Sequence, residues 1–531
     1  QMVEHGVLLF PLENGSAPMY KPPLFHWTAT ALDHLAGIDK VTAFNLRAPS
    51  ALYATAGVIL TMVFAYGLLG ASGGALAGLI LVGSYQYVSQ GRIGRVDMTL
   101  CFFETLALFT FIWWYAPRGS PLMIASPPND TRGRVRSEMR GPDAMRYLLA
   151  LALGFGVLAK GPVGAILPGL ACFIFLIGER RLGDLRRLVT PGPVVLALAL
   201  GSSWYLACFF ARRYGFLDRQ IGSENFGRFF GALGTMRPWY YAVPILINSA
   251  PMSLLAPIAI FAAIRSYWSG ERVLFAPGIV PAARSNAAPG EAAGMPEPGG
   301  RRAAVAMRLL AIFWIVTVVF FSIAAYKRRA YLLPLWPATA VVLAWWLTAI
   351  ARRQWGRILR DAIAAACAVL VVVFFAYLPY REMRQCGRDS FREAAAHINR
   401  VVGRNEPLYI YGLIDEPAPL LFYLDRSAPR IGGKLGDAPP GYVITPVRVW
   451  NDHRDEALDL EPVYQSDSGK PPVVLLRHGK AYAIRRVPRQ HVCGNAAETS
   501  LPVRSFPKSG AENRFFRVSV TRRELAGGIG R

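Results

Sequence analysis

Residues 362–380 read AIAAACAVLVVVFFAYLPY, a run of apolar positions without one charged side chain. A helix needs about 20 such residues to cross the hydrocarbon core of a bilayer. Runs of the same kind occupy 51–69 and 194–211. The 531-residue chain is 53% hydrophobic but only 17% charged, and its mean hydropathy is +0.30. These values are typical of a multi-pass membrane protein and not of a soluble domain.

Ten segments are predicted to be membrane spans. They lie near 46–69, 73–90, 98–115, 147–160, 163–178, 193–211, 243–265, 308–325, 331–350 and 361–380. The fourth and fifth are short and are separated by Lys160-Gly161-Pro162, which predicts a helical hairpin or a broken helix at a cavity. Residues 1–45 are predicted to be an outer loop with an interfacial helix near 23–35, and we expect a further span to precede it.

After residue 380 the sequence becomes polar and rich in proline, which predicts a soluble α/β domain over 381–531. A helix is predicted for Phe391–Val402, and strands are predicted for Leu408–Tyr411, Leu420–Tyr423 and Val473–Leu476. Cys386 and Cys493 lie in this region and could pair if it is extracytoplasmic, but the sequence does not test their geometry. The predicted fold class is therefore mostly α, with a transmembrane domain over 46–380 followed by this α/β domain.

The net charge of +24 comes largely from arginines in loops between the apolar runs. The arginine-rich loops are 117–146, 179–192, 266–307 and 351–360. By the positive-inside rule these loops are cytoplasmic, and contact with bilayer lipids accounts for the charge without nucleic acid. Within them, 277–300 is rich in Ala, Pro and Gly and is predicted to be a disordered insertion.

Four polar motifs interrupt the apolar sequence, and span counting places all four on the other side of the membrane. They are Lys21-Pro-Pro-Leu24, Gly91-Arg-Ile-Gly-Arg-Val-Asp97, Lys160-Gly161-Pro162 and Tyr326-Lys-Arg-Arg329. The positive-inside rule disfavours cations there, so their presence needs a reason. Binding a phosphate group at the outer leaflet would supply one, and it predicts an active site for an anionic, lipid-borne substrate.

Asp97 is the candidate catalytic residue, because an ionisable group at membrane depth is costly and is functional by default. It could instead cap the helix that starts near Met98. Lys21 and Lys160 are candidate phosphate ligands, with an interfacial lysine and a helix C-cap as their respective alternatives.

Further cations and aromatic residues lie near the outer ends of the predicted spans. Arg92, Lys327, Arg328 and Arg329 are candidate phosphate ligands, although the last three could also be interfacial anchors beside Tyr326 and Tyr331. The long outer loop contributes Glu224, Arg228 and Tyr240, which could bind sugar rings or lipid, or lie in the interface.

No metal site is predicted from the sequence. All seven histidines fall within 1–34 or 397–491, and the chain has neither an HExxH motif nor a CxxC pair. It also lacks a Gly-rich loop of the kind that binds nucleotide phosphates, which argues against a soluble nucleotide-sugar donor.

Five motifs in the same order resemble membrane glycosyltransferases of the GT-C fold, in particular the bacterial aminoarabinose (lipid A) transferases and their protein O-mannosyltransferase relatives. The motifs are Lys21-Pro-Pro-Leu with Trp27, Arg47-Ala-Pro-Ser50, Arg92 with Arg95-Val-Asp97, Leu158-Ala-Lys-Gly-Pro-Val-Gly164 with Pro168, and Lys327-Arg-Arg-Ala-Tyr-Leu-Leu-Pro334. The resemblance implies a polyprenyl-phosphate-linked sugar donor and transfer at the periplasmic face of the bacterial inner membrane. The acceptor would be lipid A, another glycan or a protein, and a divalent metal is allowed but not required.

The resemblance also suggests roles for individual residues. Asp97 matches the second acidic position of the family and Lys21 its phosphate-contacting lysine, while Arg237 and Tyr331 fall where relatives contact the donor phosphate. The leading catalytic acid of the family is expected before residue 1. Two departures leave zinc and the acceptor undecided, because Tyr20 replaces a common glutamate and the zinc-binding histidines of some relatives have no counterpart here.

Two other functions remain compatible with the sequence. A lipid or ion transporter would also use a helix broken at Lys160-Gly161-Pro162, although no internal repeat is visible. A ligase or polymerase of surface polysaccharide is the second alternative.

Overall fold

The computed structural model describes most of the chain up to residue 478. The described residues are 2, 6–13, 17–18, 21–38, 41–116, 143–231, 234–248, 255–268, 300–351, 354–389, 391–412, 418–424, 426–466 and 471–478. Most of the predicted insertion at 277–300, and Cys493 of the predicted disulfide, lie outside them.

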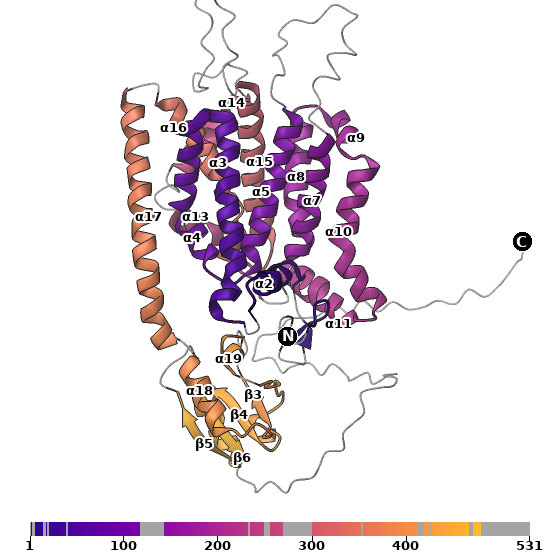
Figure 1. The fold of residues 1–531 in the computed structure, drawn as a ribbon, viewed down its shortest axis with the longest axis vertical. Coiled ribbons are helices and arrows are strands. Elements are labelled where there is room, and N and C mark those ends of the chain that lie inside the picture. Colours follow the sequence, from indigo (N-terminus) through magenta and orange to yellow (C-terminus); the bar gives the residue numbers. More distant parts are fainter. Residues whose placement is uncertain are drawn as a thin grey trace, which may run out of the picture. The chain divides into compact units, whose positions relative to one another are not determined.

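Helices dominate residues 24–389 (Figure 1). The helices of six or more residues are α2 (Leu24–Leu35), α3 (Ala43–Val82), α4 (Tyr85–Gly91), α5 (Val96–Tyr115), α7 (Asp143–Lys160), α8 (Val163–Gly178), α10 (Pro191–Phe210), π-helix η2 (Asp218–Gly227), α13 (Ala242–Asn248), α14 (Ala256–Trp268), α15 (Gly300–Ile323), α16 (Leu335–Ile350) and α17 (Gln354–Asp389). Shorter turns are η1 (Leu182–Asp184), α9 (Leu185–Leu188), α11 (Tyr214–Leu217), α12 (Arg228–Phe230), η3 (Pro238–Tyr241) and η5 (Arg329–Leu332).

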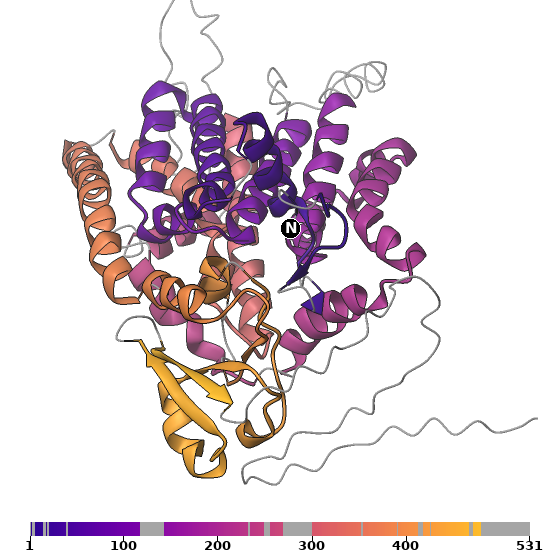
Figure 2. The same cartoon turned by 60° about the horizontal axis from the view of Figure 1, so that its bottom comes forward.

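Five of the described helices are long and apolar enough to cross a membrane. They are α3, α5, α10, residues 302–323 of α15 and residues 354–380 of α17. Helices α8 and α16 are apolar but shorter. Figure 1 shows α17 at one edge of the helices and α10 at the other, with α5 between them, and Figure 2 shows α17 and α10 at the two edges from a second direction. Helix α5 is packed against α3, α7, α8 and α15.

Helix α3 is a hairpin and accounts for two of the predicted spans, 46–69 and 73–90. The backbone of Gly70 has φ 78° and ψ −174°, a conformation that suits glycine. Beyond it the second arm folds back, and a Cβ placed on Gly74 would lie 2.9 Å from the carbonyl oxygen of Met62. The second span is shorter than predicted, because its helix ends at Val82 and α4 begins separately at Tyr85.

The predicted break at Lys160-Gly161-Pro162 is confirmed. Helix α7 ends at Lys160 and α8 begins at Val163, with Gly161 at φ +103° between them. A Cβ placed on Gly156 would lie 2.9 Å from the carbonyl oxygen of Gly164, so the two helices turn back closely on each other. Lys160, the last residue of α7, therefore lies directly before a sharp turn.

Three other predicted spans have different boundaries in the structure. The span predicted at 331–350 begins only at Leu335, because residues 329–332 form the 3₁₀ helix η5 and Pro334 precedes α16. The segment predicted as 243–265 is divided between α13 and α14. Helix α17 runs past the predicted domain boundary at residue 380 and ends at Asp389.

The C-terminal region contains a four-stranded sheet. Its strands are β3 (Leu408–Ile410), β4 (Tyr442–Pro446), β5 (Leu460–Gln465) and β6 (Val473–His478), in the order β3-β4-β6-β5. Strand β3 is parallel to β4, with Ile410 beside Ile444, and the other pairs are antiparallel. The accompanying helices are α18 (Arg392–Val401), α19 (Ala418–Tyr423) and α20 (Val447–His453), and a separate two-stranded ladder joins β1 (Leu12–Glu13) to β2 (Ala17–Pro18).

The predicted strands at Leu408–Tyr411 and Val473–Leu476 and the helix near Phe391–Val402 are confirmed. The strand predicted at Leu420–Tyr423 is wrong, since these residues belong to helix α19. A short apolar run is compatible with either structure. Pro419 in the first turn favours the helix, because its fixed φ suits that position.

We expect Gly161→Ala to lower the stability of the protein by about 1–2 kcal/mol, because φ +103° is unfavourable for alanine. The measurement is thermal unfolding in detergent. Gly169→Ala is the control, since Gly169 is an exposed position of α8 with open space around it. Equal melting temperatures for the two variants would contradict a strained turn.

Candidate active site

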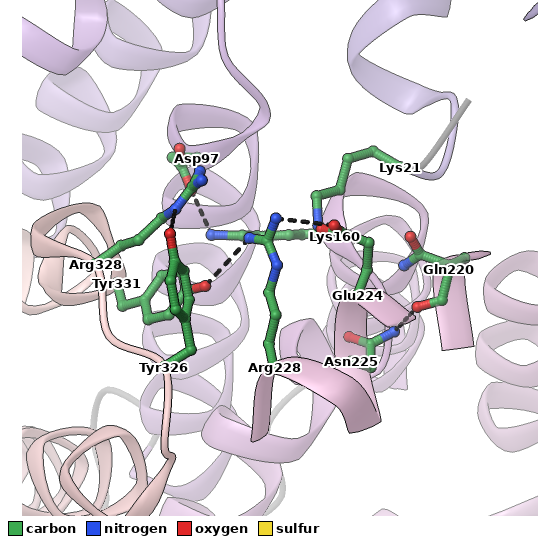
Figure 3. A network of polar contacts seen from close by, with 10 residues as sticks. All are labelled: Lys21, Asp97, Lys160, Gln220, Glu224, Asn225, Arg228, Tyr326, Arg328 and Tyr331. Carbon is green, nitrogen blue, oxygen red and sulfur yellow. Dashed lines mark hydrogen bonds and ion pairs between the residues drawn. The ribbon is translucent and has the colours of Figure 1, made fainter. Parts of the chain in front are cut away.

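Charged residues from separate elements meet at one place in the structure, as Figure 3 shows. Lys21 precedes α2, Asp97 lies in the first turn of α5, and Lys160 ends α7. The π-helix η2 contributes Glu224, and the next residues of the chain contribute Arg228. Tyr326 and Arg328 precede η5, which carries Tyr331. We call these eight residues the charged cluster.

Asp97 and Lys160 form an ion pair between the beginning of α5 and the end of α7 (Figure 3). Their side chains are only 12% and 11% exposed. Helix α5 begins at Val96, so Asp97 is inside the first turn and its carboxylate accepts from Lys160. The alternative that Asp97 serves only as an N-cap is therefore not supported.

Lys160 also contacts an aromatic ring. Its Nζ atom lies 4.7 Å from the centroid of the Tyr331 ring, within the range of a cation–π contact. Lys160 thus links α5 to the turn that precedes α16. Its side chain points into the cluster, which does not support a role limited to capping its own helix.

The carboxylate of Glu224 bridges two cations. Its Oε2 atom accepts a hydrogen bond from Lys21 at 2.6 Å, and its Oε1 atom accepts one from Arg228 at 2.8 Å. These three side chains are 12–14% exposed. Burial lowers the pKa of Lys21 to about 8, although the neighbouring Glu224 opposes this shift by favouring the charged amine.

Two tyrosines complete the cluster. The hydroxyl of Tyr331 lies 3.5 Å from Nη1 of Arg228. The ring of Tyr326 lies 5.5 Å from the guanidinium of Arg228 and 5.6 Å from that of Arg328, and Arg328 Nε is 3.4 Å from the Tyr326 hydroxyl. The arginines are therefore held by aromatic faces as well as by charge.

Backbone hydrogen bonds fix the loop that carries these tyrosines. The amides of Ala325 and Tyr326 donate to the carbonyls of Phe229 and Arg228, at 2.9 and 3.1 Å. On the other side, Gln86 of α4 donates to the carbonyl of Arg329 at 2.6 Å and accepts from Trp336 at 3.1 Å. This loop and Arg228 are consequently positioned together.

Lys327, which we predicted as a phosphate ligand, points into the protein. It is 2% exposed, and its Nζ donates to the carbonyls of Ala324 at 2.5 Å and Met236 at 3.2 Å. These bonds join the end of α15 to the outer loop. In this conformation Lys327 satisfies buried carbonyl groups and is not part of the charged cluster.

The contacts described above do not include four other predicted residues. Arg237 lies over the ring of Trp239, 5.9 Å from its centroid, and Tyr240 stacks edge-on against Tyr241. Arg92 follows Gly91, the last residue of α4, and Arg329 contributes its carbonyl to Gln86. Their assignment as phosphate or substrate ligands stays a prediction.

Residues that the sequence analysis passed over surround the cluster. Asn225 donates to the carbonyl of Gln220 at 2.7 Å, and Gln220 is fully buried close to Gly161. The signal in the sequence was the Glu224-Asn225-x-x-Arg228 spacing, which puts an acid and an arginine on one helical face. Glu224 and Arg228 were predicted as substrate candidates, but the pairing of Glu224 with Lys21 was not predicted.

Glu104 was missed altogether. It lies two turns beyond Asp97 on α5, is fully buried, and neither carboxylate oxygen has a hydrogen-bond partner. A charged carboxylate without a partner would be very costly at that depth, so we interpret this group as an uncharged acid. The argument that singled out Asp97 applies to Glu104 as well, since Glu104 is an ionisable residue inside the predicted span 98–115.

Among the residues that the structure describes, no three His, Cys, Asp or Glu side chains come together in a way that could hold a metal ion. The dependence on a divalent metal that the resemblance allowed therefore stays a prediction.

Parts of this chain are similar to known proteins. The family model of dolichyl-phosphate-mannose-protein mannosyltransferases matches residues 1–211. A protein of Aquifex aeolicus is 25% identical over 265 residues, which are 50% of this chain and 47% of that protein. The undecaprenyl phosphate-alpha-4-amino-4-deoxy-L-arabinose arabinosyl transferase of Pectobacterium carotovorum is 27% identical over 216 residues, which are 40% and 32% of the two chains. The chain thus spans about half the length of these relatives or less.

A solved structure is similar over nearly the whole chain. ArnT from Cupriavidus metallidurans, bound to undecaprenyl phosphate, superimposes with a TM-score of 0.66 and 18% identity, covering 90% of this chain and 91% of that one. The chain has a GT-C fold. Its sequence resembles the aminoarabinose transferases and protein O-mannosyltransferases, as the five ordered motifs predicted.

We expect Glu104→Gln to change stability by about 1 kcal/mol or less, because an amide replaces an uncharged acid of similar shape. Glu104→Ala should cost about 1–3 kcal/mol, since it leaves a cavity. Thermal unfolding in detergent measures both. A loss larger for the glutamine variant than for the alanine variant would indicate a charged, paired carboxylate.

Proposed function

We propose that this chain is a membrane glycosyltransferase that moves a sugar from a polyprenyl-phosphate carrier to an acceptor. The observation that carries the proposal is the charged cluster, in which Lys21 and Arg228 converge beside the Tyr331 hydroxyl. Lysine and arginine are the usual ligands of phosphate. The GT-C fold and the family match support the same chemistry.

The donor class follows from what the relatives share. One relative is named for undecaprenyl phosphate-linked aminoarabinose, and the matching family is named for dolichyl-phosphate-linked mannose. Both carriers are long polyprenyl phosphates, whereas the sugars and acceptors differ. We therefore propose the polyprenyl-phosphate sugar as donor, and lipid A, another glycan or a protein as acceptor.

In the proposed reaction an acceptor oxygen attacks the anomeric carbon of the sugar. The bond from that carbon to the phosphate oxygen breaks, the acceptor proton passes to a base, and polyprenyl phosphate leaves. The leaving phosphate gains a negative charge, which Lys21 and Arg228 would stabilise. Tyr331 would add a hydrogen bond to the same group.

Asp97 is the carboxylate that we propose to contact the acceptor. Lys160 holds the carboxylate in the first turn of α5, so its position is fixed. Such a carboxylate is suited to orient an acceptor hydroxyl and to receive its proton. The resemblance places Asp97 at the second acidic position of the family, without assigning the proton transfer to it.

We further propose that the charged cluster faces the periplasm of a bacterial inner membrane. In Figure 1 the turn α9, which carries Arg186 and Arg187, lies at the opposite end of the helices from α2 and α11. The positive-inside rule makes the α9 end cytoplasmic. The division into 1–45, 46–380 and 381–531, with the last segment in the periplasm, is part of this proposal.

We expect Lys21→Ala to lower sugar transfer from a polyprenyl-phosphate donor by about a hundredfold or more, because the leaving phosphate loses a charged ligand. The assay follows labelled sugar from the donor to the acceptor after membrane reconstitution. Lys434→Ala is the matched control, since Lys434 is exposed in the C-terminal region. Full transfer by Lys21→Ala would refute the phosphate role.

The pKa of Lys21 predicts a pH dependence. The amine is charged below about pH 8 and neutral above it, so kcat/KM for the donor should fall as the pH rises through about 8. In Lys21→Arg the guanidinium stays charged, and the fall should disappear from this range. If kcat/KM falls in the same way in the parent protein and in Lys21→Arg, the pH dependence belongs to another group.

A further inference from the structure

The carboxylate of Glu224 is bound to the same two cations that we propose as ligands of the donor phosphate. Each of its oxygens accepts from a different cation, Lys21 at 2.6 Å and Arg228 at 2.8 Å. Two oxygens of a phosphate group would use the same kind of contacts. Glu224 thus stands where a phosphate would be expected to bind.

The side chains of Lys21, Glu224 and Arg228 are largely removed from water. Competition between Glu224 and a phosphate for the two cations is therefore strong. At 12–14% exposure, a lysine or arginine without a counter-charge is costly. Before the donor arrives, Glu224 supplies that counter-charge. When the donor binds, either the Glu224 carboxylate turns away from the two cations, or the carboxylate and the donor phosphate share them at close range.

Glu224 and its two cations are held by different parts of the backbone. Glu224 lies in η2, which is a π-helix over Asp218–Gly227, and π-helical turns are uncommon and frequent at functional sites. Arg228 is anchored just after η2, because its carbonyl accepts from the amide of Tyr326. Lys21 is held in a separate segment that precedes Pro22 and Pro23.

The polyprenyl phosphate product is more negatively charged than the donor from which it is released. A polyprenyl-phosphate sugar is a phosphodiester with one negative charge, whereas the released polyprenyl phosphate is a monoester with about two near neutral pH. Buried cations would therefore hold the product more tightly than the substrate, and the product would inhibit the next turnover. A carboxylate that returns to Lys21 and Arg228 would oppose this.

We propose that Glu224 acts as an internal competitor that releases the polyprenyl phosphate product from Lys21 and Arg228. The inference rests on the proposed function, because it concerns the phosphate of that donor. In this role Glu224 is not needed to break the sugar–phosphate bond. It reoccupies the cations after transfer and so sets the rate at which the carrier leaves.

The test uses the full chain in lipid nanodiscs with undecaprenyl phosphate as ligand. We expect Glu224→Gln to bind this ligand about tenfold more tightly than the parent protein, since the amide keeps the shape but loses the charge. In transfer assays its first turnover should be affected less than its later ones. Its later turnovers should be slower, and added undecaprenyl phosphate should inhibit it more strongly.

Glu179→Gln is the matched control. Glu179 pairs with Arg308 at 2.7 Å with 20% of its side chain exposed, so this variant also breaks a glutamate–arginine pair. Its affinity for undecaprenyl phosphate should equal that of the parent protein. If Glu224→Gln does not fold, Glu224→Asp replaces it, because the shorter side chain cannot bridge both cations and should tighten binding a few-fold.

The outcomes separate the two proposals. Unchanged or weaker binding of undecaprenyl phosphate by the Glu224 variants, with normal binding by the parent protein, would overturn the competitor role alone. If the parent protein binds no undecaprenyl phosphate and transfers no sugar from it, both the proposed function and this inference are wrong.

Discussion

The ion pair between Asp97 and Lys160 is the interaction on which the rest of the candidate site depends. It joins the first turn of α5 to the last residue of α7, where the chain turns sharply at Gly161. Both groups are nearly buried, and removing either partner would leave an isolated charge, which costs several kcal/mol. Because Lys160 also lies against the ring of Tyr331, the pair determines where the turn before α16 can lie.

Cations outnumber carboxylates among the residues drawn in Figure 3, which include Lys21, Lys160, Arg228 and Arg328 beside Asp97 and Glu224. The ring of Tyr326 lies against both arginines, and its backbone amide donates to the carbonyl of Arg228. Cations gathered at a largely buried position favour the binding of an anionic ligand.

The sequence predicted the elements better than the directions of side chains. Apolar runs located the helices, and Lys160-Gly161-Pro162 located the break, since chain length and glycine chemistry are local properties. The directions of the neighbouring side chains of Lys327 and Arg328 could not be predicted from such local properties. Lys327 turns inward to carbonyl groups while Arg328 turns toward the cluster, and only the path of the backbone after α15 decides which side each occupies. The Glu224–Lys21 contact joins segments about two hundred residues apart, which no spacing pattern reports.

The same distinction explains why the phosphate end of the donor is easier to infer than the sugar or the acceptor. A phosphate demands cations, and cations near the outer ends of apolar helices stand out in any sequence. Sugars and acceptors are recognised by hydrogen bonds and by shape, which depend on side chains that the helices bring together only in three dimensions. The relatives follow this division, because the donors in their names share a polyprenyl phosphate but carry different sugars.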